Sequence, residues 1–328
     1  MKKDVLRYKT ERKDRLIQCM AADGMVRIAF VDGTNLVREA KRLLKLSRVA
    51  TAALGRQLMM TAIMSLDLKG ERDLVSTILK GDGPAGSMIC TGNSRLEVKG
   101  SVTNPDIELP LNELGKLDVG GFVGRSGKLS VVSDLGLKEP YVGLSNLVSG
   151  EVAIDFANYY AASLQRPALV YLGVRLQSGT GEVRAAAGVF AEPLPGCPED
   201  VIDRIQAKSE QIARFSERLD AGETAEELLE RVFGELGLVY VGEREPLYRC
   251  DCSRARIERA LLSIGVEELG KMIDEDRGAE VTCRFCDKIY TFTEEQLRSL
   301  QNETAAQRSS AMNKRDDAKA YEQNNEDK

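Results

Sequence analysis

Short apolar runs alternate with glycine-rich turns along the chain up to Phe190. Runs of five to eight residues rich in Val, Ile, Leu and Thr, bounded by turn-forming residues, are typical of β-strands. They predict strands over residues 25–30, 74–79, 87–91, 129–133 and 169–176.

Apolar residues recur at helical spacing in three segments of the same region. Residues 35–45 and 48–68 fit two helices, and Ser47 is placed to cap the second of them. A further helix is predicted over residues 150–165 and ends before Pro167. Strands and helices do not alternate regularly, so the sequence predicts an α+β core and not a doubly wound sheet.

Residues 199–235 have a different composition, with 16 charged residues among 37. One helix is predicted over residues 199–219, and a second opens with a capping box formed by Thr224 and Glu227. Such helices have a narrow apolar stripe, so their order should depend on docking against neighbours. Two interpretations remain open: a charged helical linker, or a hinge whose folding depends on the module that follows it.

Four of the seven cysteines form two close pairs, Cys250 with Cys252 and Cys283 with Cys286, with 30 residues between the pairs. Cysteines paired at short spacing are typical ligands of tetrahedral zinc. The chain contains no histidine, so the predicted site holds one Zn2+ by four thiolates. Four bound sulfurs leave no open coordination position, which argues against a zinc hydrolase and predicts no catalytic residue.

The residues around the pairs predict how the sulfurs are presented. The first pair is expected in extended backbone, because its alternate side chains then point to one side. The second pair is expected in a knuckle between short strands at residues 280–282 and 288–292. Between the pairs, Ser253 is placed to cap one helix, and residues 266–276 fit another.

A module of about 60 residues has too little core to be stable by itself, so a metal would supply part of its folding free energy. Neighbouring cations favour the thiolate, which is the oxidisable form of cysteine. The basic residues near the pairs are Arg249, Arg254, Arg256, Arg284 and Lys288. Disulfide formation would destroy the metal site, so the cysteines can stabilise the module when reduced and respond when oxidised.

Composition and the first residues of the chain predict where the protein is located in the cell. The chain is 43% hydrophobic and 30% charged, with a formal net charge of -5, and has no run of 18 apolar residues. Its first 20 residues lack the apolar stretch of a signal peptide. We therefore expect a cytoplasmic protein with no membrane partner. In that compartment Cys19, Cys90 and Cys197 are expected to be free thiols.

The glycines from Gly81 to Gly86 satisfy the spacing of a dinucleotide-binding fingerprint. That fingerprint requires a helix to open within the motif, because the helix N-terminus binds the pyrophosphate. Pro84 and the apolar residues 87–91 instead predict a tight turn into a strand. Nucleotide binding is therefore not expected here.

With these features the chain resembles a known family. Cys-x-Cys followed by a distant Cys-x-x-Cys is similar to the zinc module of bacterial redox-regulated chaperones, the heat shock protein 33 family or 33 kDa chaperonins. Further matching positions are Gly81-Asp82-Gly83-Pro84, Gly86, Tyr141-Val142-Gly143, Ser149-Gly150-Glu151, Asp155, Tyr159-Tyr160, Ser163 and Gln165. The resemblance spans residues 5–300.

The resemblance implies an ATP-independent holdase and not an enzyme. By analogy, the reduced zinc-bound form is inactive, and oxidants form the disulfides Cys250–Cys252 and Cys283–Cys286 and expel the zinc. The linker then unfolds, and the active form dimerises and binds unfolded or partly folded client proteins. The sequence alone indicates the metal module and the hinge; the coupling between them comes from the resemblance.

Two other classes compete with this interpretation. A zinc-ribbon nucleic-acid-binding protein needs excess positive charge, but residues 239–300 contain 10 Lys and Arg against 13 Asp and Glu. A thiol-disulfide oxidoreductase needs its Cys-x-x-Cys at a helix N-terminus, whereas a strand is predicted after Cys286. Neither nucleic acid nor catalysis is therefore expected.

The expected organisation has four segments. Residues 1–196 form a core chaperone domain and residues 197–238 a metastable helical linker. Residues 239–300 form a zinc-binding redox-switch domain. Residues 301–328 are polar and low in apolar content, which predicts a disordered tail.

Overall fold

The computed structural model describes residues 13–303, which fall into two compact units divided after Cys250. The predicted disordered tail largely lies outside the described residues, because they end at residue 303. Residues 301–303 continue a helix that begins at Glu294, so the first three residues assigned to the tail are helical.

Two β-sheets form the framework of the first unit. A five-stranded antiparallel sheet has the order β10-β1-β2-β9-β8, and a six-stranded sheet has the order β11-β5-β4-β3-β6-β7. The first contains β1 (Arg15–Ala21), β2 (Val26–Asp32), β8 (Leu169–Leu176), β9 (Val183–Pro193) and β10 (Val239–Arg244). The second contains β3 (Leu74–Gly81), β4 (Ser87–Asn93), β5 (Glu97–Val102), β6 (Gly127–Asp134), β7 (Tyr141–Asn146) and β11 (Leu247–Tyr248). Only the β11–β5 pairing among these ladders is parallel, and the expected α+β class is confirmed.

All five strands predicted in the core are present, as β2, β3, β4, β6 and β8. The central strand β9 was not predicted, because its Ala185, Ala186 and Ala187 have low strand propensity. These small side chains are almost completely buried. Burial on both faces of the sheet therefore outweighs local propensity in β9.

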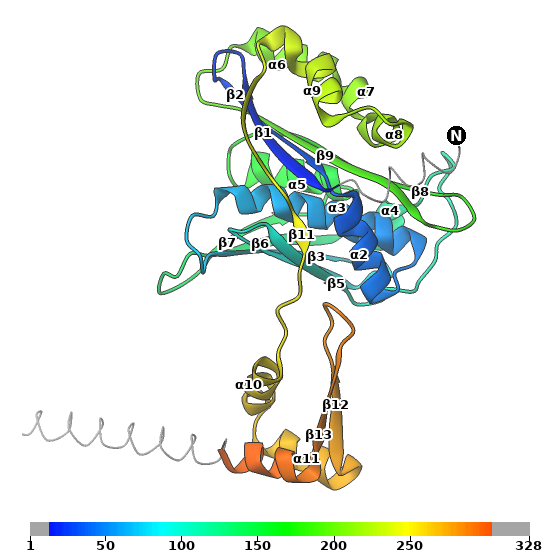
Figure 1. The fold of residues 1–328 in the computed structure, drawn as a ribbon, viewed down its shortest axis with the longest axis vertical. Helices are drawn as coiled ribbons and strands as arrows, with labels where there is room; N and C mark the ends of the chain where they lie inside the picture. The colour runs from blue at the N-terminus through cyan, green and yellow to red at the C-terminus, as the bar shows by residue number, and fades with distance from the viewer. Residues whose placement is uncertain (1–12, 304–328) are drawn as a thin grey trace, which may run out of the picture. The chain divides into compact units, whose positions relative to one another are not determined.

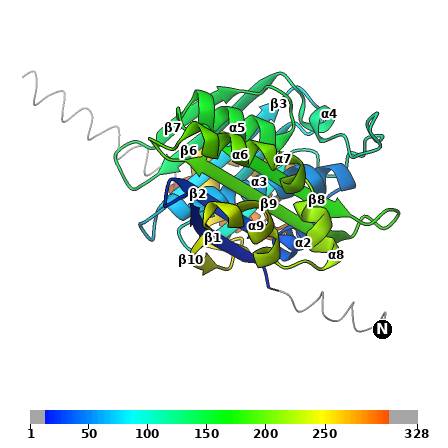
Figure 2. The ribbon, with the colours of Figure 1, turned by 90° about the horizontal axis from the view of Figure 1, so that it is seen from above.

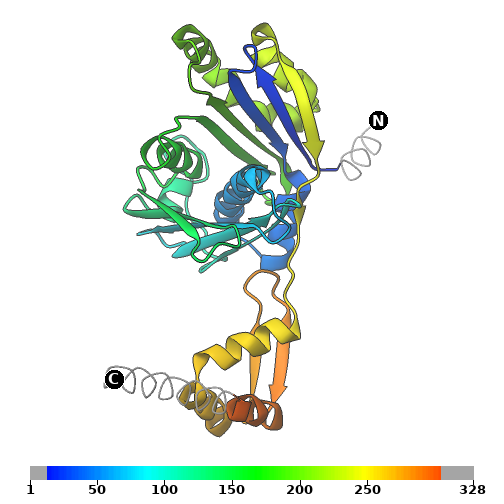
Figure 3. The ribbon, with the colours of Figure 1, turned by 90° about the vertical axis from the view of Figure 1, so that its left-hand side faces the viewer.

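Helices fill the space between the two sheets (Figures 1 and 3). They are α2 (Thr34–Leu44), α3 (Arg48–Met64), α4 (Val119–Val123) and α5 (Val152–Ala162). Ser47 caps α3 as predicted, and its hydroxyl accepts a 3.2 Å hydrogen bond from the Ala50 amide. The segment Arg48–Asp67 is long and apolar enough to cross a membrane, but 89% of its most apolar 18-residue window is buried inside the protein. It is a core helix with protein on all sides.

The glycine-rich segment after β3 is a turn into β4, as predicted. The amides of Gly83 and Ala85 donate to the carbonyls of Val123 and Phe122. A Cβ atom at Gly83 would lie 2.4 Å from the Phe122 carbonyl oxygen, so close backbone packing requires glycine there. The segment contains no helix that could bind a pyrophosphate.

A separate layer of helices covers the outer face of the five-stranded sheet (Figures 1 and 2). It consists of α6 (Glu199–Ala207), α7 (Ser209–Ile212), α8 (Phe215–Ala221) and α9 (Ala225–Phe233). The prediction of one helix over residues 199–219 is wrong, since the chain bends at Lys208 and Arg214. The capping box at the start of α9 is confirmed.

The bends bring apolar residues of α6, α7 and α8 onto the sheet. Phe215 is fully buried, and its ring centroid lies 6.0 Å from that of Phe30 and 6.5 Å from that of Tyr171. The Tyr171 hydroxyl lies 2.8 Å from the Ser216 hydroxyl. The helices therefore dock against a neighbour, as expected, and that neighbour is the five-stranded sheet.

Residues 239–250 belong to the first unit, whereas the sequence analysis assigned them to the redox-switch domain that was expected to start at residue 239. Strand β10 pairs with β1, and β11 pairs with β5. Backbone hydrogen bonding therefore joins this segment to the first unit, and the division of the chain falls between Cys250 and Asp251. The roles assigned to the four segments remain predictions.

The second unit is small and contains the elements predicted for it. These are α10 (Arg254–Ile264), α11 (Val266–Asp276), β12 (Gly278–Thr282) and β13 (Ile289–Thr293). Ser253 caps α10, and its hydroxyl accepts from the Arg256 amide. The buried side chains are few: Leu261, Leu269, Ile273, Cys283, Tyr290, Phe292 and Leu297. So small a core agrees with the expectation that the unit needs a further cross-link.

We predict that Phe215→Ala loosens the helical layer, because removal of a buried aromatic ring costs about 3–5 kcal/mol. Limited proteolysis of the reduced protein should then cut residues 199–235 much faster than in the parent. Glu210→Ala, at an exposed position of α7, is the control. Equal cleavage of the two variants would contradict this role for Phe215.

Candidate metal centre

The first thiol pair lies between a strand end and a helix start. Strand β11 holds the chain on β5, since the Arg249 amide donates to the Val98 carbonyl at 2.9 Å. The Tyr248 hydroxyl also donates to the Gly100 carbonyl at 3.0 Å. Cys250 and Cys252 follow directly, in backbone without regular structure, and the cap of α10 comes next.

The second thiol pair lies in the turn between β12 and β13, as predicted. The Cys283 amide donates to the Lys288 carbonyl at 2.9 Å, which closes the turn. The amides of Cys286 and Asp287 donate to the Cys283 carbonyl at 3.2 and 2.8 Å. Asp287 has a φ of 59°, a left-handed conformation that suits the tight reversal. This turn directs both sulfurs of the pair to the same side.

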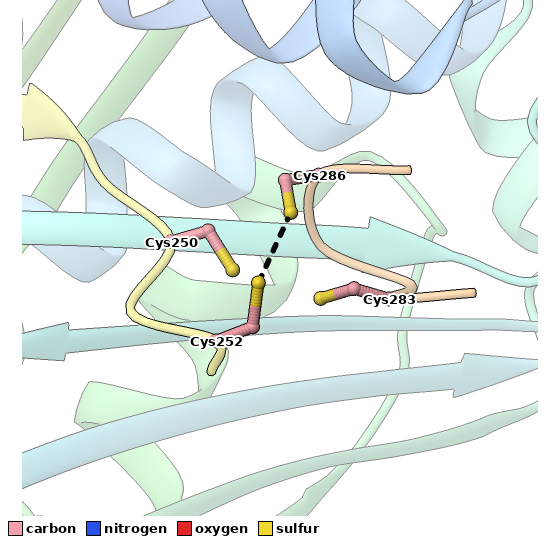
Figure 4. Close-up of side chains that lie close together, drawn as sticks. All are labelled: Cys250, Cys252, Cys283 and Cys286. Atoms are coloured by element: carbon pink, nitrogen blue, oxygen red, sulfur yellow. Dashed lines mark hydrogen bonds between the residues drawn. The ribbon is translucent and has the colours of Figure 1, made fainter. Parts of the chain in front are cut away.

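All four cysteines predicted as ligands come together (Figure 4). Their Sγ atoms lie within 4.8 Å of one another, and the Sγ atoms of Cys252 and Cys286 are 3.4 Å apart. A disulfide requires about 2.05 Å between sulfurs, and none of the four cysteines is joined in a disulfide. Cys283 is buried, and the other three are half-buried.

The chemistry of this donor set fits a metal ion. A tetrahedral ion with metal–sulfur bonds of about 2.3 Å separates its ligand sulfurs by roughly 3.8 Å. The four Sγ atoms occupy a region of that size. The cluster can therefore hold one ion with sulfur ligands only, and such a site is closed to substrate.

The cations expected around the cysteines are mostly engaged elsewhere. Arg249 pairs with Glu97 at 3.0 Å, and Arg256 pairs with Asp251. Arg254 pairs with Glu258 and also stacks on Phe292, with its Cζ atom 4.4 Å from the ring centroid. The electropositive surroundings inferred from the sequence are therefore weaker than the basic residues alone suggest.

Remaining basic side chains lie over aromatic rings of the module. The Arg284 Cζ atom is 5.3 Å from the centroid of Phe285, and the Lys288 Nζ atom is 5.1 Å from that of Tyr290. Cations at this distance interact favourably with the ring face. They also help to hold the turn that carries the second thiol pair.

Tyr290 is a site residue that the sequence reasoning missed. Its hydroxyl donates to the Cys252 Sγ atom at 3.1 Å, and its side chain is buried. This hydrogen bond raises the pKa of Tyr290 to about 12, and burial adds to the shift. The alternation of side chains along β13 places Tyr290 and Phe292 on one face, and this pattern in the sequence could have indicated that Tyr290 points inward.

The three remaining cysteines lie outside the cluster. Cys19 and Cys90 are buried in the first unit, and Cys197 is half-buried before α6. Burial raises the pKa of Cys19 to about 11 and also raises the pKa of Cys90. These two thiols are therefore protonated at neutral pH and react slowly with oxidants.

The fold and the site together define an α+β protein with a cluster of four cysteines that could hold a metal ion. The family model described as "Hsp33 protein" matches residues 14–293. The "33 kDa chaperonin" of Clostridium beijerinckii is 40% identical over 290 residues, which are 88% of this chain and 99% of that protein. Its counterpart in Acetivibrio thermocellus is 42% identical, with 88% and 97% covered.

A solved structure agrees with these sequence relatives. The crystal structure of the 33 kDa chaperonin of Thermotoga maritima is similar, with a TM-score of 0.79 and 34% identity. The match covers 90% of this chain and 100% of that one. The chain belongs to the Hsp33 family, as its sequence motifs indicated, and is a chaperone and not an enzyme.

We predict that Cys283→Ser loses tight zinc binding, because three thiolates and a hydroxyl do not replace four thiolates. The loss of affinity should exceed the about 10- to 100-fold that removal of an outer-shell partner costs. Metal content after dialysis against a competing chelator measures this. Cys197→Ser, outside the cluster, should retain one zinc per chain; stoichiometric tight zinc in Cys283→Ser would refute the ligand assignment.

Proposed function

We propose that this chaperone is a redox-regulated, ATP-independent holdase that binds unfolding proteins under oxidative stress. Its reduced form holds one zinc ion on Cys250, Cys252, Cys283 and Cys286 and is inactive. Oxidation joins Cys250 to Cys252 and Cys283 to Cys286, and the zinc leaves. The observation that carries this proposal is the convergence of four cysteine sulfurs within 4.8 Å of one another.

Zinc is the proposed ion because thiolate ligands in a tetrahedral set suit it. Bound zinc would supply structure and not catalysis, since all four positions are taken by protein. Its binding free energy would become folding free energy of the second unit, whose core is small. Loss of the ion is then equivalent to loss of that unit's main cross-link.

A peroxide would oxidise each cysteine pair to a disulfide in two successive steps. One thiolate attacks a peroxide oxygen, the O–O bond breaks, and a sulfenic acid and hydroxide form. The neighbouring thiolate then displaces hydroxide from that sulfur, and the S–S bond forms. Each disulfide therefore consumes one peroxide and two protons and yields two waters, and the zinc leaves as Zn2+.

The helical layer supplies the surface that activation would expose. Helices α6 to α9 cover an apolar face built from β1, β2 and β9. The residues of that face include Ile17, Cys19, Val26, Ile28, Phe30, Ala187, Val189 and Ala191. Detachment of the helices would open this face to clients, because unfolded proteins bind exposed apolar surface.

A polar contact ties the helical layer to the strand that leads to the cysteines. The Arg15 guanidinium in β1 donates to Glu226 at the start of α9 and to Glu243 in β10, each at 2.6 Å. These three residues hold the layer and the edge strand β10 on strand β1. Disturbance of the segment before Cys250 would therefore reach α9 through Arg15.

The remaining parts of the proposal are the cytoplasm as location and a homodimer as the oxidised form. Neither nucleic acid nor membrane is a proposed partner. Against an oxidoreductase, β13 follows the Cys-x-x-Cys turn, so no helix N-terminus activates Cys283 or Cys286. Against a nucleic-acid-binding zinc ribbon, the acidic balance of residues 239–300 disfavours phosphate.

We expect peroxide at mildly elevated temperature to release about one zinc per chain and to switch on client protection. A chromophoric chelator follows the metal, and light scattering of a thermally unfolding client follows aggregation. Protection should rise only after metal release and should reverse with thiol reductant. Equal protection before and after oxidation would remove the redox switch from the function.

We predict that Arg15→Gln lowers the threshold for activation, because it breaks both carboxylate contacts of the guanidinium. Partly exposed pairs of this kind contribute about 1 kcal/mol. The temperature at which peroxide-treated protein begins to protect a client should fall by a few degrees. Arg42→Gln, which breaks an exposed pair with Glu39 in α2, is the matched control. An identical shift in both variants would mean that Arg15 has no special role.

A further inference from the structure

The hydrogen bond from Tyr290 to Cys252 joins the two halves of the cysteine cluster. Tyr290 lies in β13, after the second thiol pair, whereas Cys252 belongs to the first pair. The donor oxygen and the acceptor sulfur are 3.1 Å apart. The contact therefore links the segments that contribute the two pairs through protein atoms and needs no metal.

The phenol ring is well fixed for this role. Tyr290 is only 7% exposed, and β13 pairs with β12 in a register that sets Tyr290 opposite Val281. The Lys288 Nζ atom lies 5.1 Å from the ring centroid. A cation over the ring face draws electron density from the phenol, which makes its hydroxyl a stronger donor.

A donor on a thiolate changes how that sulfur reacts. Attack on an electrophile uses a sulfur lone pair, and a hydrogen bond stabilises that lone pair in the ground state. The bond weakens as the sulfur loses its charge in the transition state. Cys252 therefore reacts more slowly than an equally accessible thiolate without this donor.

We propose that Tyr290 is a positioning residue that protects Cys252 from oxidation and so sets how readily the module is activated. The proposal rests on the proposed redox function for its biological meaning. In the peroxide reaction, the Cys252 thiolate attacks one peroxide oxygen, an S–O bond forms as the O–O bond breaks, and the leaving hydroxide is protonated to water by the buffer. Tyr290 keeps its own proton and slows only the attack.

The first test uses the parent chain, so it does not depend on the folding of a variant. Cys250, Cys252 and Cys286 are all half-buried. Zinc-loaded protein is treated briefly with iodoacetamide, and alkylation at each cysteine is quantified by peptide mass spectrometry. Cys252 should react about three- to tenfold more slowly than the other two. The proposal would be overturned if Cys252 were alkylated at the same rate as Cys250 and Cys286.

The second test compares Tyr290→Phe with Tyr248→Phe in the full chain loaded with zinc. Tyr248 is also next to a thiol pair in sequence, but its hydroxyl donates to the Gly100 carbonyl. Tyr290→Phe should speed peroxide-driven zinc release about three- to tenfold. In this variant Cys252 should also be alkylated as fast as Cys250 and Cys286. Tyr248→Phe should keep the parent's alkylation pattern.

Unchanged or slower zinc release in Tyr290→Phe would overturn the role of the phenol. If that variant does not load zinc, the alkylation pattern of the parent decides alone. Neither alkylation nor zinc release involves a client protein, so these readouts test the role of Tyr290 independently of the holdase function. Faster zinc release without client protection would reject the proposed function and leave the role of Tyr290 standing.

Discussion

The convergence of four thiols is the constraint on which the second unit depends. The two pairs are separated by 30 residues, and the segment between them folds into two helices and a strand whose buried side chains are few. A bound ion closes this segment into a loop, which removes conformational entropy from the unfolded chain. Without such a cross-link, a core of this size gives little stability. Any reaction that alters the sulfurs therefore acts on the folding of the whole unit.

The helical layer has a different source of order. Helices α6 to α9 are rich in charge, and their apolar stripe is satisfied by the five-stranded sheet through Phe215 and its neighbours. The hinge interpretation placed the docking surface in the metal module, whereas the contacts lie in the first unit. In the proposed function, coupling between metal and layer runs along the chain, through β10 and β11, and through Arg15, which contacts both α9 and β10. This makes the edge strand β10 the connection to examine.

A closed sulfur site suits a regulatory role better than a catalytic one. In the proposed site, four protein ligands would exclude substrate. The buried Tyr290 hydroxyl donates a hydrogen bond to the Cys252 sulfur, which by our proposal lowers the reactivity of that sulfur. The thiols outside the cluster are kept protonated by burial at Cys19 and Cys90. In the proposed function, oxidants act on the half-buried members of the cluster. Chaperone identity comes from the family, whereas redox regulation through these cysteines is our proposal.

The cluster of four cysteines, the Ser253 cap of α10 and the α+β class were all evident from the sequence, because short spacings and caps are local features. Tertiary structure alone decided the rest. Strand β9 forms from alanines because both of its faces are buried, and the segment 199–219 bends because Phe215 gains more from packing on Phe30 than from a straight helix. Residues 239–250 join the first unit through pairing with β1 and β5, and Tyr290 reaches Cys252 across 38 positions. Contacts between residues so distant in sequence leave no periodic signal, since they depend on how whole elements pack.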